Sequence, residues 1–481
     1  MAHNKFLPRV LAAAAAMMLL AGCGSKADPG FSPANPVNIT IWTYYNGEQL
    51  EAFNALVDEF NSTVGKEQGI TVESSSHGSV TDLENNVLAS AEGKVGAEAM
   101  PNIFSAYADT AYALDEMGQI ADLSDYLSEE DRAAFIEDYL SEGDFSGSGS
   151  IKIFPVAKSA ELLFLNETDW EPFAAATGAT YDDLATIEGL VSVAERYYEW
   201  TDAQTPDIPN DGRAFFGRDA MANYMLIGAK QLGCTIFAAQ GGSMTLNFDH
   251  DAVRTLWDNY YVPFIKGYFS ASGRFRSDDV KTGNIIAYVG SSSSATFFPT
   301  QVIADDMDSH DITRKALESP KFANGEDYAV QQGAGMVVTK ASDAEIQASL
   351  VFLKWFTSPE HNITFPVDSG YLPVTHEGNS IDAIRISGLA LSNEMDEVLS
   401  AAVDTVNENH LYTPHAFSGG TNARAILEYS MSDKASADRA AVKEAMAQGQ
   451  SFEEASAQFL SDECFEAWYQ DTLASLEAFQ G

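Results

Sequence analysis

The chain has 481 residues, of which 45% are hydrophobic, and carries a formal net charge of -43 at pH 7. This length exceeds one ordinary hydrophobic core and predicts two or three domains. The charge argues against binding to nucleic acid, whose phosphates would be repelled, and against adhesion to an anionic membrane surface. Such an acidic surface is compatible with a salt-rich habitat or with a simple need for solubility.

The amino terminus has the pattern of an export signal. Lys5 and Arg9 precede twelve apolar residues, 10–21, which match a signal-peptide core and are too few to span a bilayer. Residues 20–23 read Leu-Ala-Gly-Cys and resemble a lipoprotein cleavage site, so we expect a signal peptide over residues 1–22 and acylation of Cys23. The alternative is a plain signal peptide with an incidental cysteine. Residues 23–36 would then form a flexible tether, anchored through its lipid, with a reach of about 20 Å.

The two remaining cysteines, Cys234 and Cys464, leave two possibilities. They could pair in an oxidising compartment or lie apart as small buried hydrophobic residues. We favour two free thiols.

The folded part opens with a strand-helix-strand pattern. Residues 37–42 are β-branched and predict a strand, Asn46 would cap the next helix, and residues 50–60 place apolar side chains on one helical face. A second strand is expected over residues 69–74. This order predicts a parallel sheet, whose ligands lie at the carboxyl ends of the strands. Tyr44 and Asn46 therefore lie at a candidate ligand edge.

Three further stretches place polar groups after predicted strands. Thr81 and Glu84 would form a capping box, and Asp109 follows the segment 101–107. From its position alone, Asp109 is a candidate N-cap of a helix over residues 110–117. Residues 290–295 read Gly-Ser-Ser-Ser-Ser-Ala, which is either a flexible linker or a ligand-facing turn leading into a helix near Ala295.

A helix and a turn follow in the last third of the chain. Ser342 and Glu345 predict a capping box at the start of an amphipathic helix, and Ser358-Pro359 ends it and begins another. Residues 370–373 read Gly-Tyr-Leu-Pro, a turn that presents one aromatic ring.

The sequence Lys-Trp-Phe-Thr-Ser-Pro-Glu at residues 354–360, followed by Gly-Tyr-Leu-Pro-Val-Thr at 370–375, resembles the family 1 extracellular solute-binding proteins of bacterial ABC importers. Within that family it is most similar to the glycerol-3-phosphate and oligosaccharide binders. The resemblance implies an α/β fold of the periplasmic-binding-protein type, with two lobes, a multi-crossing hinge and a cleft between the lobes. It places residues 37–156 and 300–352 in lobe one, and residues 157–299 and 353–481 in lobe two.

The same resemblance assigns residues to the cleft. It makes Asp109 a carboxylate that accepts hydrogen bonds from ligand hydroxyls, as the alternative to its N-cap role. Tyr44 and Tyr371 would stack on the ligand, Ser159 in the first crossing and Ser293 in the serine turn would take its polar groups, and Gly333 would leave room for it. Ser159 alternatively satisfies only local backbone groups.

Arg424 lies in a segment similar to the one where glycerol-phosphate binders hold phosphate, and it would grip an anion with two hydrogen bonds. Its alternative role is an ion pair with Glu428. That branch also carries a Tyr-Glu pair where this chain has Tyr107-Ala108, and an aromatic residue near the aliphatic Val80. These departures put glycerol-3-phosphate itself in doubt and leave the architecture intact.

The resemblance therefore implies a lipid-anchored, extracellular binding protein that captures a sugar or oligosaccharide and delivers it to an ABC permease. Glycerol-3-phosphate or a glycerophosphodiester is the alternative ligand. The chain lacks the common motifs of hydrolases, zinc enzymes, phosphate loops and EF-hands, so we expect a non-enzyme without cofactor or metal. We also expect a monomer. An anchored glycoside hydrolase remains a further alternative, because 70 acidic residues place carboxylates in pairs by chance.

Overall fold

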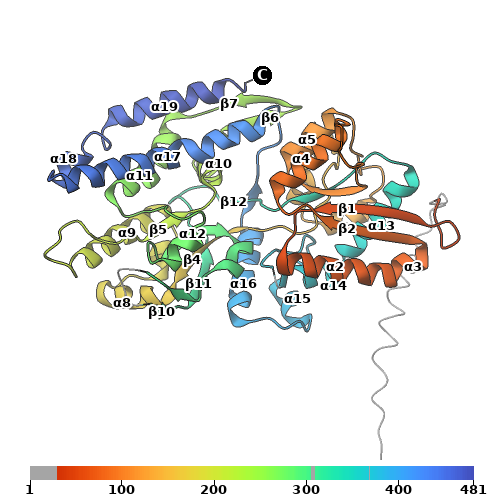
Figure 1. Cartoon of the computed structure of the whole chain (residues 1–481), viewed down its shortest axis with the longest axis horizontal. Coiled ribbons are helices and arrows are strands. Elements are labelled where there is room, and N and C mark those ends of the chain that lie inside the picture. Colours follow the sequence, from red (N-terminus) through yellow and green to blue (C-terminus); the bar gives the residue numbers. More distant parts are fainter. Residues whose placement is uncertain (1–29, 305–308, 368, 481) are drawn as a thin grey trace, which may run out of the picture.

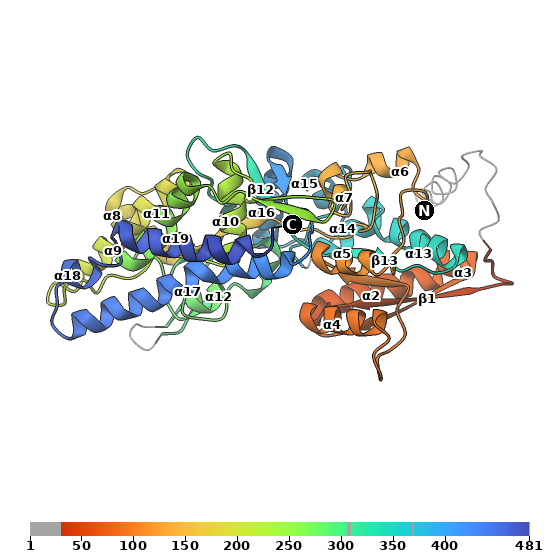
Figure 2. The ribbon, with the colours of Figure 1, turned by 90° about the horizontal axis from the view of Figure 1, so that it is seen from above.

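The computed structural model describes residues 30–304, 309–367 and 369–480. Two lobes, each built around a four-stranded sheet, lie side by side along the long axis of the molecule (Figure 1). The view from above shows the same division, with α17 and α19 on one lobe and α2 and α4 on the other (Figure 2). The predicted signal peptide and the acylation of Cys23 lie outside the described residues.

Lobe one contains a sheet with the strand order β13-β3-β1-β2. The strand β1 pairs in parallel with β2 and β3, whereas β13 is antiparallel to β3. This confirms the predicted parallel strand-helix-strand unit at the start of the fold. The elements of this lobe are β1 (Val37–Thr43), α2 (Gly47–Ser62), β2 (Ile70–Ser76), α4 (Val80–Ala91), β3 (Ile103–Ala106), α5 (Ala108–Glu116), α7 (Glu137–Ser141), β13 (Gly335–Val338), α13 (Asp343–Phe356) and α14 (Pro359–Val367).

Two helix starts in lobe one follow the predicted local chemistry, and one predicted capping box does not form. Ser342 and Glu345 form the predicted capping box of α13, and α14 begins at Pro359 as expected. The capping box predicted at Thr81 and Glu84 is wrong, because Ser79 caps α4 by accepting a hydrogen bond from the backbone N–H of Asp82.

Lobe two contains a mixed sheet with the order β11-β4-β8-β5, in which β4 is antiparallel to both of its neighbours. All six residues of β4 are buried, because helices cover the sheet. The elements are β4 (Glu161–Asn166), α8 (Glu167–Thr177), α9 (Ile187–Asp202), β5 (Phe216–Arg218), α10 (Met221–Gln231), β6 (Phe237–Gln240), β7 (Ser243–Leu246), α11 (His250–Lys266), β8 (Ala287–Ser291), η2 (Ser292–Phe297), β11 (Arg314–Glu318), α16 (Asn393–Glu408), α17 (Gly420–Ala447) and α19 (Asp462–Glu477).

The small sheet of β12 and β14 lies near the junction, and several short elements complete the chain. These are β12 (Tyr328–Val330), β14 (His410–Tyr412), α3 (Val64–Gln68), α6 (Glu129–Ala134), η1 (Tyr181–Leu184), α12 (Arg276–Lys281), β9 (Gln301–Val302), β10 (His310–Asp311), α15 (Ile381–Ile386) and α18 (Phe452–Ser456).

The predicted lobe boundaries differ from this arrangement in three places. The strand β11 was expected in lobe one, but it pairs with β4 in the second sheet. The helix α14 was expected in lobe two, but it packs against α2. The tether was expected to extend to residue 36, but Phe31 is buried in the core of lobe one, and Ser32 and Asn35 exchange backbone hydrogen bonds of 2.9 and 3.0 Å. Long-range pairing and packing, which local sequence does not encode, set these boundaries.

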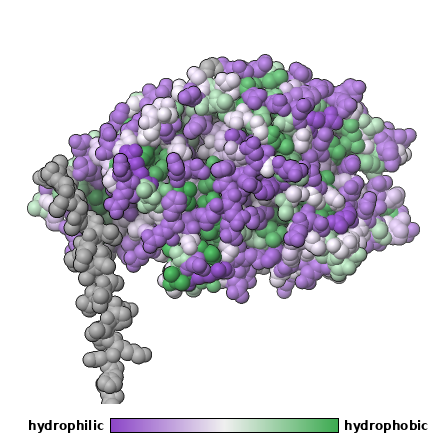
Figure 3. Space-filling model, turned by 180° about the vertical axis from the view of Figure 1, so that it is seen from behind, coloured by the Kyte–Doolittle hydropathy of each residue, from purple (hydrophilic) through white to green (hydrophobic). Residues whose placement is uncertain are grey.

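The surface of the molecule is mainly hydrophilic, and its two described cysteines are unpaired. On the face shown in Figure 3, hydrophilic residues predominate and hydrophobic ones are scattered among them. Within the described ranges, no helix combines the length and apolarity needed to cross a membrane. Cys234 and Cys464 are both free thiols, as favoured.

Candidate functional site

Three chain segments pass between the lobes and touch one another. Phe154 pairs with Met336, Ser159 pairs with Gln332, and Lys158 pairs with Leu372 through backbone bridges. The first crossing therefore runs between the second crossing, near residue 332, and the third, near residue 372. These contacts form the hinge at which the two lobes meet.

A cavity of about 440 Å³ lies between the lobes beside this hinge. It receives residues from both lobes and from all three crossings, and its walls mix aromatic rings with hydroxyl, amide and carboxylate groups. Its lining includes Glu84, Tyr107, Asp109, Glu142, Ser159, Asn223, Phe237, Ser293, Gln331, Gln332, Gly333, Tyr371, Thr413, His415, Phe417, Thr421 and Arg424.

Most of the residues predicted for the cleft line this cavity. They are Asp109, Ser159, Ser293, Gly333, Tyr371 and Arg424. Tyr44 lies directly behind the lining and shares a side-chain hydrogen bond with Tyr371. Asn46 is exposed outside the lining, where its amide donates to the carbonyl of Tyr44 at 3.1 Å. Asn46 occupies the N-cap position of α2, but its side chain makes no capping bond.

Tyrosines form the wall contributed by lobe one. Tyr44 follows β1, and Tyr107 is the N-cap residue of α5. Burial raises the pKa values of the Tyr44 and Tyr107 hydroxyls, and proximity to Tyr371 raises both further. The hydroxyls of Tyr44 and Tyr107 are thus neutral at physiological pH and serve as hydrogen-bond donors and acceptors.

Gly333 is required by the hinge itself. Its φ is +96°, a conformation that favours glycine, and an added Cβ would lie 2.9 Å from the carbonyl oxygen of Ala157. The space next to Gly333 that was predicted for ligand is therefore partly filled by the first crossing. Ser159 is 4% exposed, and its backbone N–H donates to the carbonyl of Gln332 at 3.0 Å.

The serine turn forms a short 3-10 helix, η2, rather than a helix beginning near Ala295. The Ser291 hydroxyl accepts from the backbone N–H of Ser293 at 3.3 Å, and the two hydroxyls lie 2.9 Å apart. Ser292 donates to the carbonyl of Gly370 at 2.7 Å, so the turn is tied to the third crossing.

Arg424 belongs to a buried polar chain. Its guanidinium donates to the side-chain oxygen Oδ1 of Asn223, and the side-chain amide Nδ2 of Asn223 donates to Oε1 of Glu161 at 2.7 Å. Arg218 forms a buried ion pair with the other oxygen of Glu161. The alternative partner, Glu428, instead accepts backbone N–H bonds at the start of α10. Arg424 is thus held in the cleft by Asn223.

Asp109 faces the first turn of α17 across the cleft. It accepts from the Thr421 hydroxyl at 3.4 Å, and burial raises the pKa of its carboxyl, an effect that Arg424 opposes. The alternative role as an N-cap is not adopted, because Tyr107 holds that position and Asp109 lies inside the first turn of α5.

Sequence reasoning missed Glu142, Asn223, Gln331 and Gln332 as cleft residues. The two glutamines directly precede Gly333, so their place beside a crossing was the one available signal. Arg218 is buried and forms its ion pair with Glu161. Nothing in the local sequence connects residues 161 and 218.

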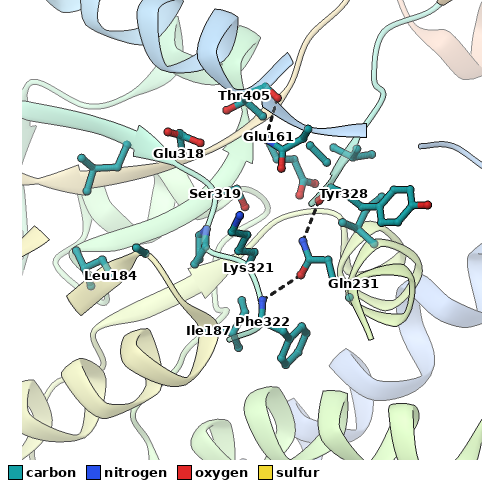
Figure 4. A pocket seen from close by; sticks show the side chains of 18 of the residues that line it. Glu161, Leu184, Ile187, Gln231, Glu318, Ser319, Lys321, Phe322, Tyr328 and Thr405 are labelled. Carbon is teal, nitrogen blue, oxygen red and sulfur yellow. Dashed lines mark hydrogen bonds between the residues drawn. The ribbon is translucent and has the colours of Figure 1, made fainter. Parts of the chain in front are cut away.

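A second cavity of about 440 Å³ lies within lobe two (Figure 4). The Gln231 side chain bridges two of its walls, accepting from the Phe322 N–H at 3.1 Å and donating to the Tyr328 carbonyl at 2.9 Å. Its described lining contains no residue from the sheet of lobe one. Because this cavity does not join the lobes, the interlobe cavity is the better candidate for the solute site. Within the described residues, no group of three or more metal-ligating side chains is placed to hold an ion.

A sequence profile described as bacterial extracellular solute-binding protein matches residues 55–383. The chain belongs to this family. Its members bind solutes and are not enzymes, which removes the glycoside hydrolase alternative. No curated protein matches the chain in sequence.

Solved structures of solute-binding proteins share the fold. The cyclic alpha-maltosyl-1,6-maltose binding protein from Arthrobacter globiformis has a TM-score of 0.67 and 17% identity over 92% of this chain and 100% of its own. UgpB from Mycobacterium tuberculosis, in complex with glycerophosphocholine, has a TM-score of 0.62 and 17% identity over 83% of this chain and 95% of its own. The sugar-binding protein MalE from Xanthomonas citri has a TM-score of 0.64 and 14% identity over 92% of this chain and 98% of its own. At these identities the similarity establishes the two-lobe α/β fold alone.

Proposed function

We propose that this chain is the substrate-binding protein of an ABC importer and that it captures a sugar or short oligosaccharide in the interlobe cavity. The observation that carries the proposal is the cavity lining, in which Tyr107 and Tyr371 stand among hydroxyl, amide and carboxylate groups. Aromatic faces stack on the apolar faces of sugar rings, and the polar groups bond to hydroxyls. Two structural relatives, from Arthrobacter globiformis and Xanthomonas citri, are described as sugar binders.

The charge of the lining favours a neutral ligand. Glu84, Asp109 and Glu142 contribute three carboxylates to the lining. Arg424 contributes one guanidinium, which already donates a hydrogen bond to Asn223. A phosphate would meet more negative than positive charge at short range, where solvent screens poorly. A glycerophosphodiester is the second candidate, because Arg424 retains further N–H donors and the UgpB relative holds glycerophosphocholine.

Ligand binding would favour a closed form, since a ligand that contacts both lobes has differential affinity for that form. Two contacts already join the lobes across the mouth of the cavity. The Gly241 N–H of the β6–β7 hairpin donates to the Phe145 carbonyl at 3.2 Å, and Thr421 bonds to Asp109. The closed protein would then dock on the permease as a monomer, anchored through Cys23 at the outer face of the cytoplasmic membrane.

Calorimetric titration of the chain beginning at Gly24 tests the ligand class. The panel contains short oligosaccharides, glycerol-3-phosphate and glycerophosphodiesters. We expect an oligosaccharide to bind, to be recovered unchanged, and to retain most of its affinity in the Arg424→Ala variant. Binding of a phosphate compound alone, abolished by that substitution, would instead assign the chain to glycerol-phosphate uptake.

A further inference from the structure

Glu142 is a buried carboxylate on the wall of the interlobe cavity. It directly follows α7 and is 8% exposed. It contributes to the raised pKa of Tyr107, after burial and Tyr371, which places it beside the ring at the cavity wall. A carboxylate buried to this degree is strongly unfavourable unless a cation and hydrogen bonds compensate it.

Lys158 supplies that compensation from the centre of the hinge. It is fully buried, with 0% exposure, and its ammonium group donates to Oε2 of Glu142 and to the carbonyl of Gly333 at 2.7 Å. Its backbone exchanges two hydrogen bonds with Leu372, of 3.1 and 2.6 Å. One residue of the first crossing therefore binds the second crossing, the third crossing and the carboxylate at the cavity wall.

The remaining hydrogen-bonding capacity of this cluster is unused. Oε2 of Glu142 accepts from both Lys158 and the Gln331 amide, the latter at 3.2 Å, whereas Oε1 accepts no hydrogen bond from the described residues. The side-chain amide oxygen Oε1 of Gln332 is also buried without a partner in the described ranges. Both residues line the cavity. Free acceptors in a buried wall call for donors, and the hydroxyl groups of a sugar are donors of this kind.

We infer that Glu142 is a specificity-determining residue whose Oε1 accepts a hydrogen bond from a ligand hydroxyl, and that Lys158 is the positioning residue that holds this carboxylate in place. The inference rests on the proposed sugar-binding function. A hydroxyl bound to Glu142 is connected through the ammonium of Lys158 to all three crossings, so ligand recognition and hinge geometry share one set of contacts. Hydrogen bonds to an ionised, desolvated acceptor are among the stronger ones, and they favour ligands whose hydroxyl occupies this position.

The test is a thermodynamic cycle that combines one substitution in the protein with the removal of one hydroxyl from the ligand. Sugar affinity is measured by calorimetry for the wild type and for Glu142→Gln, each with the parent sugar and with single-deoxy analogues. Glutamine can keep its carbonyl toward Lys158 and would present an amide donor to the ligand. We expect Glu142→Gln to weaken binding of the parent sugar at least about tenfold. One deoxy analogue should bind the wild type about tenfold more weakly than the parent does, and the variant equally well.

A second pair of variants separates recognition from stability. Lys158→Met leaves Glu142 buried without its cation, so the melting temperature should fall. Combining it with Glu142→Gln removes both charges, and the melting temperature should recover while sugar affinity stays low. The matched control is Lys152→Met, which removes the nearby ion pair with Asp115 and should leave affinity unchanged.

The outcomes distinguish this inference from the proposed function. A wild type that binds no sugar refutes the function and the inference together. A wild type that binds sugar, with Glu142→Gln binding as tightly and every deoxy analogue losing the same affinity in both proteins, overturns the inference alone. Recovery of affinity together with stability in the double variant would also overturn it, because the pair would then be only structural.

Discussion

Replacing Gly333 by alanine should destabilise the hinge by an amount that can be separated into two parts. The first part is conformational, because φ is +96° and a side chain in the left-handed region costs about 1–2 kcal/mol. The second is steric, because the new Cβ would lie 2.9 Å from the Ala157 carbonyl oxygen and 3.1 Å from Cα of Lys158. Both neighbours are backbone atoms in a packed crossing, so overpacking adds about 1–3 kcal/mol.

Gly78→Ala is the matched control. Gly78 has a similar φ of +81° but no heavy atom within 4 Å of the added Cβ, so it carries the conformational cost alone. Urea unfolding should show a loss of about 1–2 kcal/mol for Gly78→Ala and about 2–5 kcal/mol for Gly333→Ala. Sugar affinity should fall for Gly333→Ala only, since Lys158 donates to the carbonyl of Gly333. Equal losses of stability for the two variants would refute the steric argument.

Three other substitutions give sharp expectations. Tyr371→Ala should weaken sugar binding at least about tenfold by calorimetry, because a stacking face is lost, and an unchanged Kd would contradict the proposed role. Burial raises the pKa of Asp219 to about 6, so the folded protein binds this proton more tightly than the unfolded chain does, and stability falls as pH rises from about 4 to about 6. Asp219→Asn should therefore increase the free energy of unfolding by at most about 3 kcal/mol at pH 7 and raise the melting temperature there, but not at pH 4. Ser342→Ala should lower the free energy of unfolding by about 1 kcal/mol through loss of the α13 cap, and no change in urea unfolding would show that the cap is dispensable.

Local chemistry explains which parts of the fold were predictable. The parallel β1–α2–β2 unit, the capping box at Ser342 and the start of α14 at Pro359 depend on residues close in sequence. The family resemblance pointed to Tyr371, Ser159 and Gly333, which line the cavity, because these residues lie on the crossings themselves.

Long-range pairing explains what was missed. The sheet that β11 joins is decided by its pairing with β4, about 150 residues away in the chain, and no local pattern encodes that choice. Glu142 has an ordinary surface-like sequence context, and only the fold brings it to the buried ammonium of Lys158. Asn46 was placed correctly at the end of its strand, but the side chain points to exposed backbone rather than into the cavity.

The position of the β6–β7 hairpin suggests a practical use. The three crossings meet at Lys158, so a rotation of the lobes would pivot there, and the displacement of any point grows with its lever arm from that pivot. In Figure 1 the β6–β7 hairpin reaches across the junction toward lobe one, and the N–H of its Gly241 donates to the Phe145 carbonyl. A fluorophore pair on Gln240 and Ser146, both exposed residues next to this contact, would therefore convert a small hinge rotation into a large optical signal. The same geometry makes this protein a candidate scaffold for a reagentless sugar sensor.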